Sequence, residues 1–140
     1  MRILLDTNVL VAAVTRDTDR SDEAIELLDQ ADDPLVSVLS LMELRSVLSK
    51  KKRFERDRID DIENRITSRM TVTFPDASDM MAANRLQSNT LLYPMDAMIL
   101  SAAEAADATL VSFDSELVEH GAEPTQQLLD EGEDVTTDES

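Results

Sequence analysis

Short apolar runs alternate with longer amphipathic segments along most of the chain. Four runs rich in leucine, valine and threonine predict buried strands at 2–5, 35–38, 71–74 and 109–113, and a fifth short strand is predicted at 123–126. Helical spacing of apolar residues predicts helices at 8–14, 21–31, 40–49, 56–69, 77–87 and 97–106. This alternation predicts an α/β fold, with a central parallel sheet of four or five strands and helices on both faces.

The domain organisation follows from where this pattern stops. We expect a single domain over residues 1–128, followed by an acidic, mobile tail over 129–140 that has almost no apolar residues. No run approaches the roughly 18 apolar residues that a membrane helix needs. The first predicted strand begins at Arg2, which leaves no room for a secretory leader. We therefore expect a cytoplasmic protein with no membrane partner.

The residue types present restrict the chemistry. The chain has no cysteine and a single histidine, His120. Thiolate metal sites and cysteine nucleophiles are excluded, and zinc would lack its usual nitrogen and sulfur ligands. Any bound metal should therefore be a hard ion held by oxygen, such as Mg²⁺ or Mn²⁺.

The charge is strongly and unevenly negative. The chain carries 13 basic and 30 acidic residues, a net charge of −17. A strongly acidic surface argues against nucleic-acid binding, but it is also expected of a protein adapted to a salt-rich cytoplasm, which is the interpretation we favour. Residues 45–58 are the exception, with a net charge of +5 that includes Lys50, Lys51, Lys52 and Arg53. This stretch is either a solvated helix end or a surface that contacts RNA phosphates.

Three acidic residues stand apart from the clusters of surface acids. Asp6, Glu43 and Asp96 are each the only acid within a long stretch of the chain. Asp6 directly follows the first predicted strand, and Asp114 directly follows the fourth. Because the carboxyl ends of parallel strands meet at one edge, we expect Asp6 and Asp114 to lie close together. Carboxylates held close together repel one another, and a divalent cation would remove that penalty.

Glu43 is the most unusual of these acids in its local setting. On a helix it falls beside Leu39 and Val47, so we expect it to lie among apolar side chains. A carboxylate there is costly unless it is paired or binds a metal. The structural alternative is an ion pair with Arg45 or Arg85.

The other three acids each have a plausible capping role. Asp6 precedes a predicted helix and is placed to cap it or a turn. Asp96 stands immediately before the helix predicted at 97–106, and Asp114 precedes a segment that can form a helical turn. Taken singly, none of the three distinguishes a capping role from a catalytic one.

Four short motifs, taken in order, resemble those of the PIN-domain family, in particular its VapC-type toxin ribonucleases. They are LLDTNVL at 4–10, SLMEL at 40–44, DAMILSAA at 96–103 and LVSFD at 110–114. The resemblance extends from Arg2 to about Gly121. It implies a PIN-like nuclease domain, with Asp6, Glu43, Asp96 and Asp114 as catalytic acids and with Asn8 and Ser112 supporting them.

The same resemblance implies a reaction and partners. An endoribonuclease of this kind would hydrolyse RNA phosphodiester bonds with Mg²⁺ or Mn²⁺ held by Asp6, Asp96 and Asp114, while Glu43 either binds the metal or orients the attacking water. Lys50, Lys51, Lys52 and Arg53 would contact the RNA backbone. The short single-domain chain favours the toxin of a type II toxin–antitoxin pair, with a small antitoxin protein as partner, and we expect a homodimer.

Other functions remain to be weighed against this one. A stand-alone RNA-processing nuclease, or a non-catalytic binding module of the same fold, would share most of these features. A receiver domain or aspartyl-phosphate phosphatase would need a lysine near a later strand end, but all three lysines lie at 50–52. With only two glycines, the chain has no Gly-rich loop for a dinucleotide.

Overall fold

A parallel four-stranded sheet forms the centre of the computed structural model, which describes residues 1–125 and 128–129. The strand order is β3-β2-β1-β4, and each neighbouring pair is parallel. The strands are β1 (Arg2–Leu5), β2 (Asp33–Ser37), β3 (Thr71–Thr73) and β4 (Thr109–Val111). The predicted α/β class and parallel sheet are confirmed.

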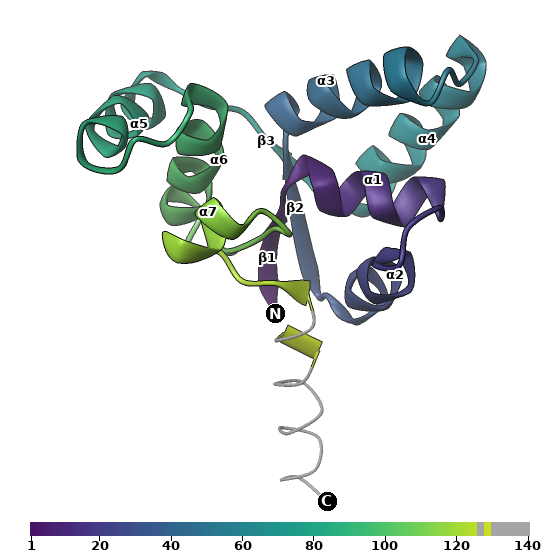
Figure 1. The fold of residues 1–140 in the computed structure, drawn as a ribbon, viewed down its shortest axis with the longest axis horizontal. Helices are drawn as coiled ribbons and strands as arrows, with labels where there is room; N and C mark the ends of the chain where they lie inside the picture. The colour runs from purple at the N-terminus through teal and green to yellow at the C-terminus, as the bar shows by residue number, and fades with distance from the viewer. Residues whose placement is uncertain (126–127, 130–140) are drawn as a thin grey trace, which may run out of the picture.

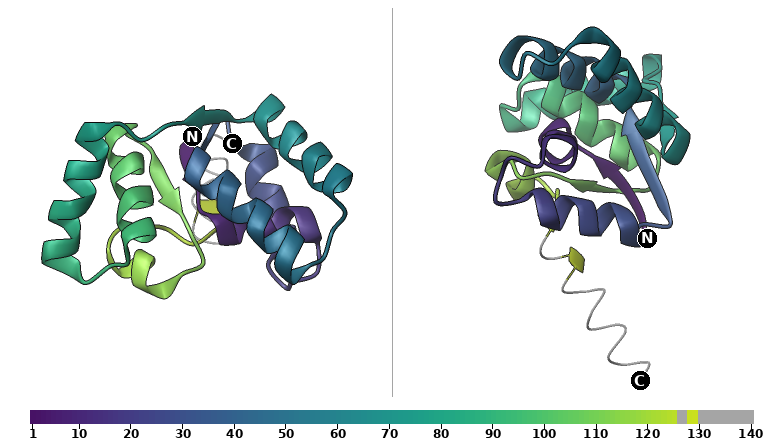
Figure 2. Two further views of the ribbon diagram at one scale, coloured as in Figure 1. Left: turned by 90° about the horizontal axis from the view of Figure 1, so that it is seen from above. Right: turned by 90° about the vertical axis from the view of Figure 1, so that its right-hand side faces the viewer.

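Helices cover both faces of this sheet, as the sequence predicted. Figure 1 shows α1 to α4 on one side of the strands and α5, α6 and α7 on the other, and Figure 2 shows the same division from above. The helices are α1 (Thr7–Thr15), α2 (Ser21–Gln30), α3 (Val38–Ser46), α4 (Arg56–Arg69), α5 (Ala77–Thr90), α6 (Pro94–Ala105) and α7 (Ser115–Glu119). A π-helical turn, η1 (Val47–Lys51), continues α3.

The two faces of β1 belong to two separate apolar cores. Ile3 and Leu5 are fully buried in a cluster with residues of α1 to α4, whereas Leu4 is buried in a cluster with residues of α5 and α6. Successive side chains of a strand point to opposite faces, so a strand covered on both sides needs an unbroken apolar run. This requirement accounts for the sequence Ile3-Leu4-Leu5.

The strand order determines where along the sheet a site can form. β1 lies between β2 and β4. The chain moves from β1 to β2 and β3 in one direction across the sheet, and it then returns past β1 to β4 in the other direction. Leu5 pairs with Val111, and the backbone N–H of Asp6 donates to the carbonyl of Val111 at 3.0 Å. Asp6 therefore leaves the sheet beside the end of β4, at the switch point where open α/β sheets form their sites.

Some predicted boundaries differ from the structure. The fifth strand is reduced to a single parallel bridge between Val111 and Glu123, and Gln126 lies outside the described residues. The helix predicted from Ala97 begins three residues earlier, at Pro94, because the fixed φ of proline suits a first helical position. Most of the predicted tail, 130–140, also lies outside the described residues. No helix in the described part of the chain is long and apolar enough to cross a membrane.

Candidate active site

Asp6 is the buried carboxylate of the site, with 9% of its surface exposed. It follows β1 and caps α1, where its Oδ1 accepts a hydrogen bond from the Thr7 backbone N–H at 2.8 Å. Burial raises the pKa of Asp6, and hydrogen bonds from Ser112 and the Thr7 backbone partly offset that rise. The predicted capping role is therefore real, but capping does not require such a buried carboxylate.

Ser112 connects the acids at the ends of β1 and β4. Its fully buried hydroxyl donates to Oδ2 of Asp6 at 2.8 Å and accepts from Nδ2 of Asn8 at 3.2 Å and from the Asp114 backbone N–H at 3.0 Å. Oδ1 of Asn8 accepts from the Phe113 backbone N–H at 3.2 Å. Asn8 and Ser112 thus hold the segment that carries Asp114 in a fixed position beside Asp6.

Asp114 caps the short helix α7, as one of the sequence alternatives expected. Its Oδ1 accepts from the backbone N–H groups of Glu116 at 2.9 Å and Leu117 at 3.2 Å. Both bonds go to one oxygen, and within the described structure Oδ2 is left free for another ligand. Capping and ligand binding are therefore compatible at this residue.

Asp96 lies in the first turn of α6 and does not cap it. The N-cap of α6 is Tyr93, so the predicted capping role of Asp96 is wrong. Burial and, in decreasing order, the negative charges of Asp6, Asp114, Glu116 and Glu43 together raise the pKa of Asp96 to about 6. Asp96 is therefore a half-buried carboxyl that four other carboxylates repel and that makes no capping bond.

Glu43 is more exposed than its sequence setting predicted. It lies on the exposed side of α3, between the half-buried Leu39 and Val47. Partial desolvation and the charge of Asp6 raise the pKa of Glu43, while the Thr7 hydroxyl and the charge of Lys51 lower it. Its apolar neighbours therefore do not enclose it.

The expected ion-pair alternative for Glu43 is also not found. Arg45 instead binds Asp60 at 2.6 Å and Glu63 at 3.0 Å. No ion pair joins Arg85 to Glu43 in the part of the chain that the structure describes. Glu43 therefore has no ion-pair partner among the described residues, and the charge of Asp6 raises its pKa.

The four acids come from four separate elements and influence one another electrostatically. Asp6 raises the pKa of both Glu43 and Asp96, and Asp114 raises that of Asp6 and Asp96. Among the described residues, however, no three acidic or histidine side chains lie close enough to hold a metal ion as they stand. An ion would have to draw these carboxylates together, and the repulsion between them would be relieved when it did.

Thr7 and Glu116 were missed by the sequence reasoning. Thr7 is buried; its backbone N–H donates to Asp6, and its hydroxyl lowers the pKa of Glu43. Its position in the sequence between Asp6 and Asn8 could have indicated that it contributes to the site. The negative charge of Glu116 raises the pKa of Asp96. Glu116 was missed because it is close in sequence to other acids, whereas the acids singled out were isolated in the sequence or directly followed a predicted strand.

The basic patch is only partly available to a ligand. Lys50 and Lys51 are exposed on η1, and Lys51 lies near enough to Glu43 to lower its pKa. Lys52 instead binds Asp17 at 2.7 Å. Arg53 is exposed and adopts a positive φ of 56° directly after the turn. Three of the four predicted contact residues are therefore free to meet a phosphate.

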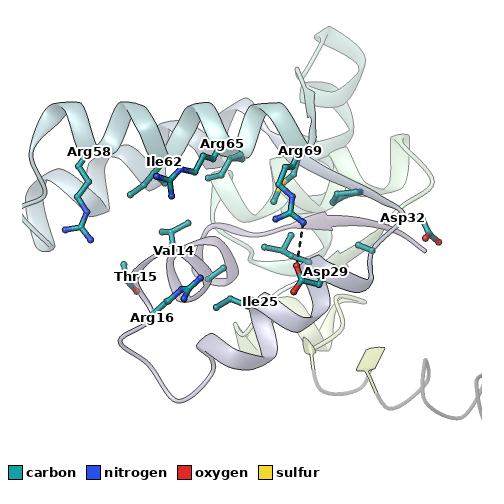
Figure 3. A pocket seen from close by; sticks show the side chains of 16 residues that line it. Val14, Thr15, Arg16, Ile25, Asp29, Asp32, Arg58, Ile62, Arg65 and Arg69 are labelled. Carbon is teal, nitrogen blue, oxygen red and sulfur yellow. Dashed lines mark ion pairs between the residues drawn. The ribbon is translucent and has the colours of Figure 1, made fainter.

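A larger cavity lies apart from the carboxylates, between α1, α2 and α4 (Figure 3). Its volume is about 550 Å³, and apolar residues such as Ile25 and Ile62 form part of its wall. Four arginines also line it, Arg58, Arg65 and Arg69 from α4 and Arg16 from the end of α1. Of these, Arg69 pairs with Asp29 at 3.6 Å. Asp29 and Asp32 also line the cavity, but the arginines outnumber them on a protein with a net charge of −17.

Comparison with known proteins places this arrangement in a family. The PIN domain model matches residues 3–123. No curated protein matches the chain, but solved structures do. VapC20 of Mycobacterium tuberculosis, a toxin that cleaves the sarcin–ricin loop, is 17% identical with a TM-score of 0.73, and the match covers 86% of this chain and 95% of that one.

Two toxin–antitoxin assemblies share the same fold. VapBC2 of Rickettsia felis, bound to a promoter DNA fragment, matches at 24% identity and a TM-score of 0.69, over 86% of this chain and 93% of that one. DNA-bound VapBC of Salmonella typhimurium matches at 19% identity and a TM-score of 0.69, over 89% and 96%. The family match covers most of the chain, including all four acids of the site, and the chain therefore belongs to the PIN domain family.

Proposed function

We propose that this protein is a divalent-metal-dependent endoribonuclease that hydrolyses RNA phosphodiester bonds. The observation that carries the proposal is the electrostatic state of Asp96, whose pKa is raised to about 6 by burial and by four neighbouring carboxylates. A fold gains no stability from such a cluster, so its presence points to a positively charged ligand. Membership of the PIN domain family supports the same conclusion.

The chemistry of the donor set suits Mg²⁺ or Mn²⁺. Every candidate ligand is a carboxylate oxygen, which these hard ions prefer. Asp6 and Asp96 would bind the ion directly, and Oδ2 of Asp114 would bind it directly or through water. When bound, such an ion activates water and stabilises charge on the phosphate oxygens.

The remaining residues of the site would orient the reacting groups. The Ser112 hydroxyl already donates to Oδ2 of Asp6, which fixes the direction of the carboxylate. The Thr7 hydroxyl is near enough to Glu43 to lower its pKa. Glu43, exposed and with a raised pKa, is suited either to complete the ion's ligand set or to hold the attacking water.

RNA is the proposed substrate despite the acidic surface. Lys50, Lys51 and Arg53 are exposed, and Lys51 is near Glu43, so a phosphate backbone that reaches the carboxylates would pass this positive turn. Lys52 would join them only by giving up its bond to Asp17. These basic residues would attract the RNA phosphates locally, whereas the rest of the acidic surface repels them.

A small antitoxin is the proposed protein partner. Two structural neighbours, from Rickettsia felis and Salmonella typhimurium, are toxin–antitoxin complexes bound to DNA. In this chain, the cavity rimmed by arginines between α1, α2 and α4 offers an apolar wall and positive charge (Figure 3). That combination suits an acidic amphipathic segment of such a partner.

A homodimer is also proposed, and exposed apolar side chains support it. Met80 and Met81 on α5 are 52% and 58% exposed, and the adjoining Leu91 and Tyr93 are 92% and 73% exposed. Large exposed apolar side chains along one helix and the segment after it are typical of a surface that another protein covers. A second copy of this chain would cover them.

Cleavage of RNA tests the proposed reaction. The protein is incubated with total RNA in EDTA, Mg²⁺ or Mn²⁺, beside Asp6→Asn and Asp96→Asn variants. Asp61→Asn, at an exposed position of α4, is the matched control for loss of one charge. We expect cleavage by the wild type and the control only when metal is present. Cleavage that survives EDTA or either active-site substitution would show that the mechanism is wrong.

A further inference from the structure

A second, smaller cavity adjoins the carboxylates between α1, α3 and the segment after β4. Its volume is about 340 Å³, within the range of about 300–1,000 Å³ typical of small-ligand sites. Thr7, Asn8 and Glu43 line it, and all three belong to the candidate active site. A group held in this cavity would therefore be next to the atoms proposed to carry the reaction.

The rest of the cavity wall combines apolar surface with one cation. Val11 and Val47 contribute the apolar part, together with the ring of Phe113, and Arg20 contributes the positive charge. An apolar slot with a cation at its rim matches a nucleotide, which has a flat base and an anionic phosphate.

The guanidinium of Arg20 lies over this aromatic ring. Its guanidinium carbon is 4.6 Å from the centroid of Phe113, a cation–π contact. Arg20 is exposed and makes no salt bridge within the described structure, while its backbone N–H donates to the Thr18 hydroxyl at 3.2 Å. The contact with Phe113 therefore holds an otherwise unpaired guanidinium plane over the cavity.

Phe113 is tied to the carboxylates through its backbone. It stands between Ser112 and Asp114, and its N–H donates to Oδ1 of Asn8 at 3.2 Å. The same Asn8 donates to the Ser112 hydroxyl that binds Asp6. The position of the ring is thus fixed relative to the site by the hydrogen bonds that orient its central acid.

We propose that this cavity binds the nucleobase next to the scissile phosphate, stacked on the paired Arg20 and Phe113 side chains. The inference rests on the proposed ribonuclease activity and adds a binding subsite to it. Guanidinium planes and aromatic rings both stack on bases, and stacking tolerates any base because each has a π face. Arg20 and Phe113 are positioning residues that set which phosphate reaches Asp6 and Glu43.

Fluorescence of 2-aminopurine, which falls when the base stacks, tests this directly. RNA pentamers of mixed sequence, each with 2-aminopurine at one internal position, are titrated with protein in EDTA so that binding is read without cleavage. Phe113→Leu keeps an apolar side chain but removes the aromatic face. Arg20→Lys keeps the charge but removes the planar group. Arg85→Gln, exposed on α5, is the matched control.

The expected result is quenching by the wild type and by Arg85→Gln. Phe113→Leu and Arg20→Lys should lose the quenching and bind about 5- to 150-fold more weakly, the range expected for one stacked base. Quenching by Phe113→Leu or Arg20→Lys equal to that of the wild type overturns the subsite, and so does no quenching by the wild type. Metal-dependent cleavage without quenching refutes the subsite alone, whereas quenching without cleavage refutes the proposed reaction alone.

Discussion

Replacing Asp96 with asparagine should stabilise the metal-free protein at neutral pH. The substitution keeps the size of the side chain but removes a charge that four other carboxylates repel, Asp6 first among them. The pKa of Asp96 is raised from 3.8 to about 6, so the folded state holds the proton more tightly than the unfolded state does. Ionised Asp96 therefore destabilises the fold, by an amount that grows between these two pH values and is constant above them.

The size of the effect follows from the pKa values. A rise from 3.8 to about 6 corresponds to at most about 3 kcal/mol. Solvent screening at this partly exposed carboxyl reduces the expected gain to about 1 kcal/mol. For a chain of this length, that gain raises Tm by about 4 °C.

The assay is thermal unfolding in EDTA at low ionic strength, at pH 7.5 and again near pH 3.5. Asp61→Asn is the control, because it removes an exposed charge on α4. We expect Asp96→Asn to be more stable than wild type at pH 7.5 and nearly equal to it near pH 3.5, where the wild-type carboxyl is mostly protonated in both states. A variant that is no more stable at pH 7.5, or whose advantage persists in acid, would show that the neighbouring carboxylates do not destabilise ionised Asp96.

Four further predictions concern the rest of the molecule. Ser112→Ala should lower the free energy of unfolding by about 1–3 kcal/mol in a denaturant titration, because it leaves two partly buried donors and the buried Asp6 without their partner; unchanged stability would contradict the network. Thermal stability of the wild type should rise between low and molar KCl, since salt screens the net charge of −17, and a flat response would end the halophile interpretation. Exchanging Lys50 and Lys51 for glutamine should weaken RNA binding and reduce its salt dependence by about 0.7 in log–log slope per lost phosphate contact, and an unchanged slope would exclude the patch. Leu91→Asp should convert a dimer to a monomer in light scattering, and a wild type that is already monomeric would remove the dimer from the account.

The fold was predictable because burial on both sides of a strand leaves a strong sequence signal. Ile3, Leu4 and Leu5 form an unbroken apolar run, which only a covered parallel strand requires. Boundaries were less predictable where local preferences compete. Pro94 suits both a loop and a first helical turn. In the structure it begins α6, which packs against α5 and β4, and the sequence alone does not reveal these contacts.

The sequence could nominate acids for the candidate site, but it could not show what surrounds them. Asp6 and Asp114 follow strands, so topology alone placed them together. The prediction that Glu43 lies among apolar side chains was wrong, because the apolar residues four positions away line the same helix face without enclosing it. The Thr7 bonds and the charge of Glu116 at Asp96 depend on side chains from separate elements, which no spacing along the chain encodes.

If Asp6, Glu43, Asp96 and Asp114 form one centre around a metal ion, calorimetric titration with Mn²⁺ should show saturable binding by the wild type and by Asp61→Asn. Asp6→Asn and Asp96→Asn should lose this binding while remaining folded by circular dichroism. Equal Mn²⁺ binding by all four proteins, or none by the wild type, would contradict a shared metal centre.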